Sequence, residues 1–387
     1  MRPFSCCCRR RRGREQKHQQ AQNAPRIRGQ RVVLVHHGED ERQSSGFPDP
    51  QLTTLGLEQA RALRGNPLLE GCDLLVVSPL RRAVETAVAI FGEKPGCRAM
   101  LTALHTERWS GTCDEGQPKP ELLKQFPFLT EWDGWAALPD GAWWPTASSD
   151  ASFREMRVPA FHKWLRAQPE RRIVVVGHGG FFEALSGGRQ LQGGEACELP
   201  RTVLVDMDGV LCDFEAQFLR RWRDAHPEAA WLPEAQRRTH YVDKDPSGVY
   251  DTERSHAIIT SPGFYETMPP MEGAIEALSQ MEATGSIRTC ICTAPFGTSE
   301  VAARCEAEKR VWVEANLGKE WLTPWKFVCV KDKTAVPGDL LIDDKPEPST
   351  HWRHEAAESP SWKHVVFTQP FNVEDTACEG KPRLDRW

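Results

Sequence analysis

Short apolar runs alternate with helix-like segments along this chain, and the alternation occurs in two successive blocks. The first block contains runs at 31–35 (RVVLV), 73–77 (DLLVV) and 172–176 (RIVVV), and the second contains runs at 202–205 (TVLV) and 339–342 (DLLI). Continuous Val, Leu and Ile runs are typical of strands buried on both faces of a parallel sheet. We therefore predict an α/β fold with two domains, each a mainly parallel sheet sandwiched by helices.

The boundary between the two blocks is marked by a glycine-rich segment, GGRQLQGG at 187–194. The length of 387 residues suffices for two ordinary hydrophobic cores. From these signals we expect a tail at 1–28, a first domain at 29–186, a linker or last strand at 187–200, a second domain at 201–375 and a tail at 376–387.

The composition is that of a soluble globular protein, with 40% hydrophobic and 27% charged residues. The net charge of −5 gives no reason to expect a nucleic-acid polymer as a partner. No apolar stretch approaches the roughly 18 residues that a transmembrane helix needs. The 13 cysteines are odd in number and scattered, which favours a reducing compartment, so we expect a cytoplasmic location.

The first 28 residues contain Cys6, Cys7 and Cys8, followed by four arginines. Cysteines beside a basic run are typical of an acylated membrane anchor. An arginine-rich stretch without acidic residues before Glu15 is also typical of an organelle transit peptide. A disordered polar tail is the third interpretation, and the sequence leaves all three open.

Two carboxylates, Asp206 and Asp208, directly follow the first strand of the second block. Such a close pair at the carboxyl end of a buried strand is unfavourable unless a cation lies between them. A hard divalent cation would relieve the repulsion and would also neutralise a phosphate group. Asp206 can then act as a nucleophile towards phosphate, while Asp208 protonates the leaving alcohol and later activates water.

Three later segments supply the remaining groups that this chemistry needs, each after a predicted strand. Thr293 offers a hydroxyl to the phosphate, and Lys333 offers a positive charge to nucleophile and phosphate. Asp343 and Asp344 complete a cation site. A pair of aspartates alone is more often a helix cap or a turn, but four segments in this order favour a phosphatase.

These motifs resemble those of the haloacid dehalogenase superfamily, and the sequence around them resembles the 5′(3′)-deoxyribonucleotidases of that superfamily. The similarity runs from 201 to 368 and includes VLVDMDGVLCDFE (203–215), ICTAP (291–295) and KDKTAVPGDLLIDDK (331–345). It implies nucleoside monophosphates as substrates and Mg²⁺ as the cofactor. By this resemblance the Mg²⁺ ligands are Asp206, Asp208 through its carbonyl, and Asp344, with Asp343 as the alternative, and the phosphate ligands are Thr293 and Lys333.

The same resemblance assigns 214–285 to a small helical cap over the substrate. Phe214 falls where the family stacks an aromatic ring on the nucleobase, although it is also typical of a core residue. His240 and Tyr241 depart from the family's glycine and aromatic residues but can still stack and hydrogen-bond, and Lys345 stands where an arginine can occur. These departures leave a non-nucleotide phosphate ester open as the alternative substrate.

The first block carries histidines after two of its predicted strands, namely His36 and His37 and, later, His178. Histidines at the carboxyl ends of parallel strands can face one phosphate, one as nucleophile and another as donor. Arg82, at the start of a helix, would add a bidentate clamp. Glu107 would protonate a leaving oxygen.

This set resembles the histidine phosphatase superfamily through LVHHGE (34–39), SPLRRAVETA (78–87) and VVVGHGG (174–180). The family motif is Arg-His-Gly, and here a histidine replaces its arginine, which removes a permanent charge. We expect a second phosphatase site without a metal; the alternative is a catalytically weak binding or oligomerisation module, which is compatible with a homodimer. By the resemblance His37 is the nucleophile, Glu107 the proton donor, and His36, Arg82 and His178 the phosphate ligands.

Overall fold

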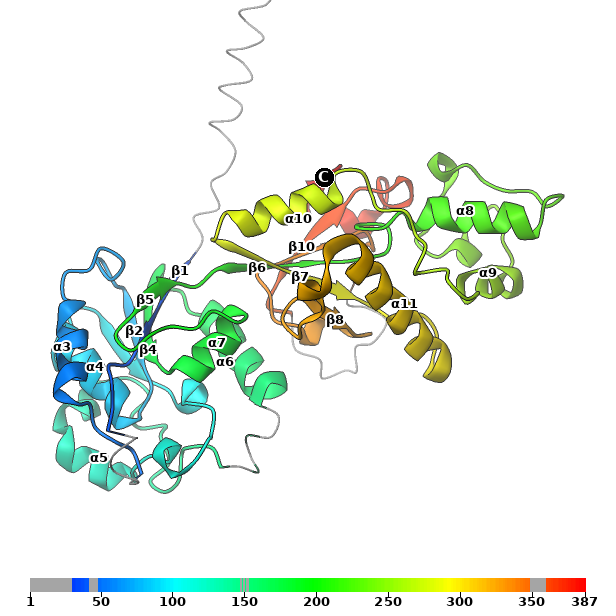
Figure 1. The fold of residues 1–387 in the computed structure, drawn as a ribbon. Coiled ribbons are helices and arrows are strands. Elements are labelled where there is room, and N and C mark those ends of the chain that lie inside the picture. Colours follow the sequence, from blue (N-terminus) through cyan, green and yellow to red (C-terminus); the bar gives the residue numbers. More distant parts are fainter. Residues whose placement is uncertain (1–29, 42–47, 147, 149, 151–152, 349–359) are drawn as a thin grey trace, which may run out of the picture.

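The structure is a computed structural model that describes residues 30–41, 48–146, 148, 150, 153–348 and 360–387. Two domains lie side by side, and each contains one sheet with helices packed on it (Figure 1). The predicted two-domain α/β fold is thereby confirmed. The cysteines of the expected acyl anchor, Cys6, Cys7 and Cys8, lie outside the described residues. Among the helices of the described segments, none has the length and apolar character needed to span a membrane.

The first domain is built on five strands in the order β3-β2-β4-β1-β5, in which only β5 is antiparallel. Side chains of a strand alternate between the faces, so Leu34 packs with Phe181 on one face, while Val33 and Val35 pack with Val84 on the other. The strands are β1 (Arg31–His36), β2 (Leu74–Val77), β3 (Arg98–Leu101), β4 (Arg172–Gly177) and β5 (Ala196–Glu198). The α-helices are α3 (Thr54–Ala62), α4 (Arg81–Phe91), α5 (Lys119–Gln125), α6 (Val158–Arg166) and α7 (Gly179–Ser186).

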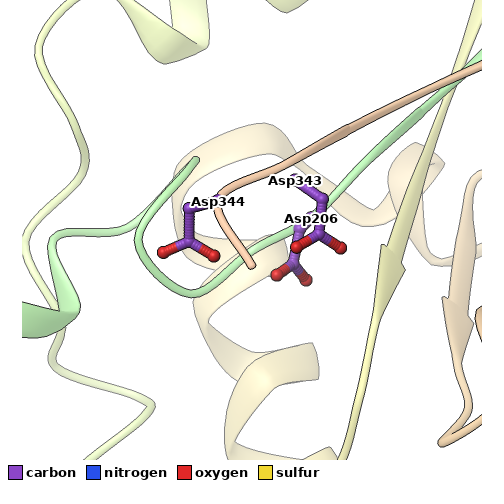
Figure 2. Close-up of side chains that lie close together, drawn as sticks. All are labelled: Asp206, Asp343 and Asp344. Carbon is purple, nitrogen blue, oxygen red and sulfur yellow. The ribbon is translucent and has the colours of Figure 1, made fainter. Parts of the chain in front are cut away.

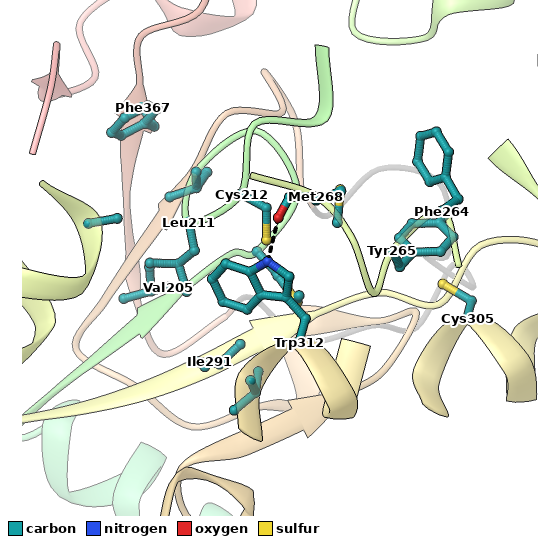
Figure 3. Close-up of a cluster of buried hydrophobic side chains, with 14 of the residues drawn as sticks. Val205, Leu211, Cys212, Phe264, Tyr265, Met268, Ile291, Cys305, Trp312 and Phe367 are labelled. Atoms are coloured by element: carbon teal, nitrogen blue, oxygen red, sulfur yellow. Dashed lines mark hydrogen bonds between the residues drawn. The ribbon is translucent and has the colours of Figure 1, made fainter. Parts of the chain in front are cut away.

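The second domain has six parallel strands in the order β11-β10-β9-β6-β7-β8. In its main core, Trp312 lies beside Val205 and Ile291 and donates a hydrogen bond from Nε1 to the Met268 carbonyl at 2.7 Å (Figure 3). The strands are β6 (Arg201–Val205), β7 (Ile287–Thr293), β8 (Phe327–Cys329), β9 (Leu340–Asp343), β10 (Lys363–Phe367) and β11 (Arg383–Leu384). The α-helices are α8 (Phe214–Ala225), α9 (Thr252–Ile259), α10 (Ala274–Ala283) and α11 (Ser299–Leu317).

Two boundaries differ from the sequence-based expectation. Residues 376–387 are not a tail, because β11 pairs with β10 and the Trp387 Nε1 donates to the Val210 carbonyl at 2.7 Å. The cap consists of α8 and α9, which project to one side of the sheet in Figure 1, whereas α10 packs on β7 in the main core. The expected cap at 214–285 is therefore too long. A strand of only two residues, such as β11, is too short to leave a pattern in the sequence. The sequence alone also does not show whether a helix such as α10 belongs to the cap or to the main core.

The passage between the domains consists of Leu199 and Pro200 alone, because β5 ends at Glu198 and β6 begins at Arg201. The segment 187–200 therefore contains the last strand of the first sheet. Since β5 runs antiparallel to β1, the passage lies near the amino ends of β1 and its parallel neighbours, and it leads into the amino end of β6. The carboxyl ends of the parallel strands in both sheets consequently point away from the junction.

Candidate active site

Three buried carboxylates gather at the carboxyl ends of β6 and β9 in the second domain (Figure 2). Asp206 follows β6, Asp343 is the last residue of β9, and Asp344 is the next residue along the chain. One carboxylate oxygen of each lies within 4.8 Å of the others. Clustered carboxylate oxygens are the ligands that Mg²⁺ prefers, and a cation would offset their mutual repulsion. The three side chains therefore fit a hard divalent cation.

Lys333 forms ion pairs with two of the three carboxylates in this cluster. Its Nζ lies 2.7 Å from Asp206 Oδ1 and 2.7 Å from Asp343 Oδ2, so it forms ion pairs with both. Burial opposes a charged lysine, yet the two carboxylates raise the pKa of Lys333 above its usual range, which keeps it protonated. Burial raises the pKa of Asp206 to about 6 in the absence of a cation, with Lys333 acting in the opposite direction.

Asp344 stands apart from the lysine and is the most available ligand for a cation. Its Oδ1 is buried without a hydrogen-bond partner among the described residues. Burial and the neighbouring Asp343 and Asp206 raise the pKa of Asp344 well above its usual value. A carboxyl of this kind gains most from a cation, because the cation stabilises its ionised form. Its partner Asp343 is instead held ionised by Lys333, which lowers its pKa against the effect of burial.

Lys309 on α11 is a site residue that the sequence analysis missed. Its Nζ is buried and donates to Asp208 Oδ2 at 2.7 Å, to Thr293 Oγ1 at 2.8 Å and to the Ala294 carbonyl at 2.8 Å. It therefore fixes both the expected acid/base and the expected phosphate ligand. The available signal was a lysine on the same helix face as the buried Trp312, since a buried lysine needs an ionic partner.

A cavity of about 810 Å³ opens between these carboxylates and the cap. The four residues that the sequence analysis assigned to the substrate all line it: Phe214, His240, Tyr241 and Lys345. Phe214 also packs against Phe218 and Phe264, so it is both a cavity wall and a core residue. His240 Nδ1 lies 3.9 Å from Asp344 Oδ1, and burial lowers the pKa of His240 to about 3, which keeps the ring neutral.

In the first domain, the three expected histidines lie together at the carboxyl ends of β1 and β4. The ring centroid of His37 is 4.5 Å from that of His36 and 5.2 Å from that of His178. His37 Nδ1 donates to the Gly38 carbonyl at 2.7 Å, which leaves Nε2 as the basic nitrogen. Burial lowers the pKa of His178 well below its usual value. The geometry brings the expected nucleophile and phosphate ligands into one place.

Arg82, however, is surrounded by two carboxylates that the sequence analysis did not single out. Its Nη2 lies 3.0 Å from Asp114 Oδ1, and its Nε lies 3.3 Å from Asp40 Oδ2. Its Nε also donates to His37 Nε2 at 3.2 Å, and its Nη1 donates to the Cys113 carbonyl at 3.0 Å. All the side chains in these ion pairs are buried. A phosphate group at this site would be the third anion around one guanidinium.

Glu107 lies against the first turn of α7, near the histidines. Its carboxylate accepts hydrogen bonds from the amides of Gly180 at 3.2 Å and Phe181 at 3.0 Å. Burial raises the pKa of Glu107, although hydrogen bonds from the backbone amides of Arg108 and Gly180 favour its ionised form. A carboxyl with a raised pKa remains protonated to a higher pH, which suits the expected proton donor.

Known families match the two halves of the chain separately. The sequence model of the family "5′ nucleotidase, deoxy (Pyrimidine), cytosolic type C protein" matches residues 201–387. The human mitochondrial 5′(3′)-deoxyribonucleotidase is 35% identical over 204 residues, which are 52% of this chain and 83% of the relative. The chain belongs to the 5′(3′)-deoxyribonucleotidase family. The human cytosolic type of this family is 36% identical over 187 residues, or 48% of this chain and 88% of the relative.

The first half of this deoxyribonucleotidase family member matches the histidine phosphatase superfamily (branch 1) over residues 32–204. A glucosyl-3-phosphoglycerate phosphatase of Mycolicibacterium vanbaalenii is 29% identical over 180 residues, which cover 41% of this chain and 74% of the relative. Both resemblances drawn from the sequence motifs are thereby confirmed. The first match ends at residue 204 and the second begins at residue 201, where the chain passes from one sheet to the other.

Proposed function

We propose that the second domain hydrolyses nucleoside monophosphates through an aspartyl-phosphate on Asp206, with Mg²⁺ as cofactor. The buried cluster of Asp206, Asp343 and Asp344, with Lys333 paired to only two of them, is the observation that carries this proposal. Asp206, Asp344 and the Asp208 carbonyl would hold the cation. When bound, it would neutralise the phosphate and position it for attack.

The residues of the chain then carry out two displacements. In the first, an Asp206 oxygen forms a bond to phosphorus, the bond to the leaving oxygen breaks, and Asp208 gives that oxygen its proton. In the second, Asp208 takes a proton from water, the water oxygen bonds to phosphorus, and Asp206 is released with inorganic phosphate. Lys309 holds Asp208 in place for both proton transfers, and Thr293 and Lys333 hold the phosphate oxygens.

Two observations support nucleotides as the substrates: the names of the relatives and the size and lining of the cavity. The matching relatives are named 5′(3′)-deoxyribonucleotidases. A cavity of about 810 Å³ has room for a nucleoside monophosphate, and Phe214 in its wall is an aromatic residue of the kind that packs against a planar base. The alternative, a non-nucleotide phosphate ester, draws its support from His240 and Tyr241, which make this wall more polar.

For the first domain we propose the phosphohistidine type of phosphatase chemistry on His37, at a low rate. The arrangement of His37, His178 and Glu107 supports the activity. The two carboxylates around Arg82 support its weakness, because they compete with phosphate for the guanidinium. The alternative remains a binding or oligomerisation module, in keeping with the loss of the motif arginine at His36.

We also propose a cytoplasmic location. The scattered cysteines of the chain support it, because they suit a reducing compartment. All ten cysteines in the described part of the chain are free thiols. Attachment to a membrane through Cys6, Cys7 and Cys8, targeting to an organelle, and formation of a homodimer stay as further proposals from the sequence.

A metal-dependence assay tests the two sites together. The intact protein, Asp206→Asn and His37→Ala are assayed on an aryl phosphate with Mg²⁺ and with EDTA. We expect EDTA and Asp206→Asn each to remove nearly all turnover, and His37→Ala to remove little. Full activity of His37→Ala in EDTA would overturn the aspartyl mechanism. A panel of nucleoside monophosphates against glucose 6-phosphate then tests the substrate class: nucleotides hydrolysed no faster than the sugar phosphate would overturn the nucleotidase proposal.

A further inference from the structure

The cap contributes a fixed carboxylate to the wall of the substrate cavity. Asp243, in the short helical turn Val242–Lys244, lines the cavity, and its side chain is 10% exposed. Its Oδ2 accepts a hydrogen bond from Thr252 Oγ1 at 3.1 Å and lies 3.3 Å from Lys244 Nζ. His256 Nε2 lies 3.8 Å from the same oxygen. None of these groups has a part in the phosphate chemistry.

These contacts hold the carboxylate in one orientation. Thr252 and His256 project from the same face of α9, one turn apart, and both reach Oδ2. Because these three contacts are made to Oδ2, Oδ1 is the acceptor that a molecule in the cavity would use. A carboxylate that is already oriented loses little entropy on binding, so its hydrogen bond discriminates well between ligands.

The surroundings of Asp243 match a planar base better than a sugar. His256 meets the ring of Phe296 edge to face at a centroid distance of 5.2 Å, and both residues line the cavity. Phe214 also lines the cavity. Aromatic walls with polar groups among them are typical of base recognition, in which stacking holds the ring and a polar group binds its edge.

We infer that Asp243 makes this enzyme select nucleobases that present amino or adjacent N–H donors, guanine first, over uracil and thymine. This inference rests on the proposed nucleotidase function. A carboxylate only accepts hydrogen bonds, and guanine offers a ring N–H beside an amino group. Uracil and thymine offer a single ring N–H between two carbonyl oxygens, and those oxygens would repel the carboxylate. The family description names pyrimidines, so this chain would depart from it.

The test compares kcat/KM for the 5′-monophosphates of deoxyguanosine, deoxycytidine, deoxyadenosine, thymidine and deoxyuridine. For the wild-type protein we expect dGMP to be preferred over dTMP by about tenfold or more, the usual effect of one charge-assisted hydrogen bond. In Asp243→Asn, whose amide both donates and accepts, that preference should fall to about twofold. p-Nitrophenyl phosphate carries no nucleobase for Asp243 to bind, so its turnover should not change.

Asp224→Asn is the matched control, because Asp224 lies on the cap with a largely exposed side chain and should leave the base order unchanged. Affinities measured by calorimetry in the inactive Asp206→Asn background should follow the same order. If wild-type protein hydrolyses dTMP as well as dGMP, or if Asp243→Asn keeps the full wild-type preference for dGMP, the inference is overturned while the proposed function stands. If no nucleotide is hydrolysed although p-nitrophenyl phosphate is, the proposed function itself has failed. If Asp243→Asn does not fold, the wild-type comparison still tests the inference, because equal rates on dGMP and dTMP would overturn it.

Discussion

Arg166 on α6 of the first domain forms a buried ion pair with Asp339 of the second domain, with Nε 2.9 Å from Oδ1 and each side chain 8% exposed. The same oxygen lies 2.8 Å from Arg201 Nη1, and the Thr202 amide donates to Oδ2 at 2.8 Å. Asp339 directly precedes β9, the strand that ends in Asp343. The contact between the domains is therefore tied to the strand that carries part of the candidate metal site.

Replacing Arg166 should destabilise the protein, because it leaves Asp339 buried with fewer positive partners. For Arg166→Met we expect a loss of about 2 kcal/mol in the free energy of unfolding. The loss is smaller than for an isolated buried ion pair, because Arg201 still pairs with Asp339. Urea unfolding measures this loss. Arg189→Met is the matched control, since Arg189 pairs with Glu195 at the surface and should change stability by less than about 0.5 kcal/mol. If Arg166→Met lowered the free energy of unfolding by as little as Arg189→Met does, the ion pair between the domains would contribute nothing measurable to stability.

Cation affinity should depend on pH through Asp344, whose pKa is raised well above its usual value, and through Asp206. Burial raises the pKa of the Asp206 carboxyl to about 6 without a cation, so below that pH a proton competes with the metal. Affinity for Mg²⁺ or Mn²⁺ should therefore weaken as the pH falls from 7 to 5, by about tenfold for each pH unit below 6. Calorimetric titration of the metal alone measures this, and Asp206→Asn should show a flatter profile. A wild-type affinity that is constant over this range would contradict the assignment.

Loss of Lys309 should slow the step in which the leaving alcohol is protonated. Without its Nζ, Asp208 loses its fixed position and its partner charge, and we expect Lys309→Met to reduce kcat on nucleotides by about 100-fold. p-Nitrophenolate needs no proton to leave, so the loss on p-nitrophenyl phosphate should be about tenfold smaller. Lys319→Met, at an exposed lysine, is the control and should match the wild type. A loss that is the same on both substrates would point to a purely structural role.

Removing a carboxylate from Arg82 should strengthen the site in the first domain. In the Asp206→Asn background with EDTA present, Asp40→Asn should raise the remaining phosphatase activity by about tenfold, because the guanidinium then has one fewer anion beside it. Adding His36→Arg should raise it further. The rate on an aryl phosphate is the measurement, with His37→Ala as the blank. If Asp40→Asn lowers the rate instead, the carboxylate supports catalysis.

The sequence predicted the central strands well because both of their faces are buried, so their apolar runs are continuous. It could not place Lys309, whose role depends on α11 packing beside the end of β7 rather than on any local pattern. Asp40 and Asp114 were missed for the same reason, since their importance comes from meeting Arg82 in space. The strand β11 escaped prediction because only Arg383 and Leu384 form it. The motifs are visible in the local sequence, whereas the residues that contact them are brought there only by tertiary packing.

The two-residue passage at Leu199 and Pro200 also determines how a metabolite could travel between the two sites. Both sites lie at strand ends that point away from the junction, and no long tether connects the domains that could swing one towards the other. A product released by one site must therefore diffuse through bulk solvent before the other can bind it. Any competing enzyme in solution has the same access to that intermediate, so the fusion joins the two candidate sites in fixed stoichiometry without channelling between them.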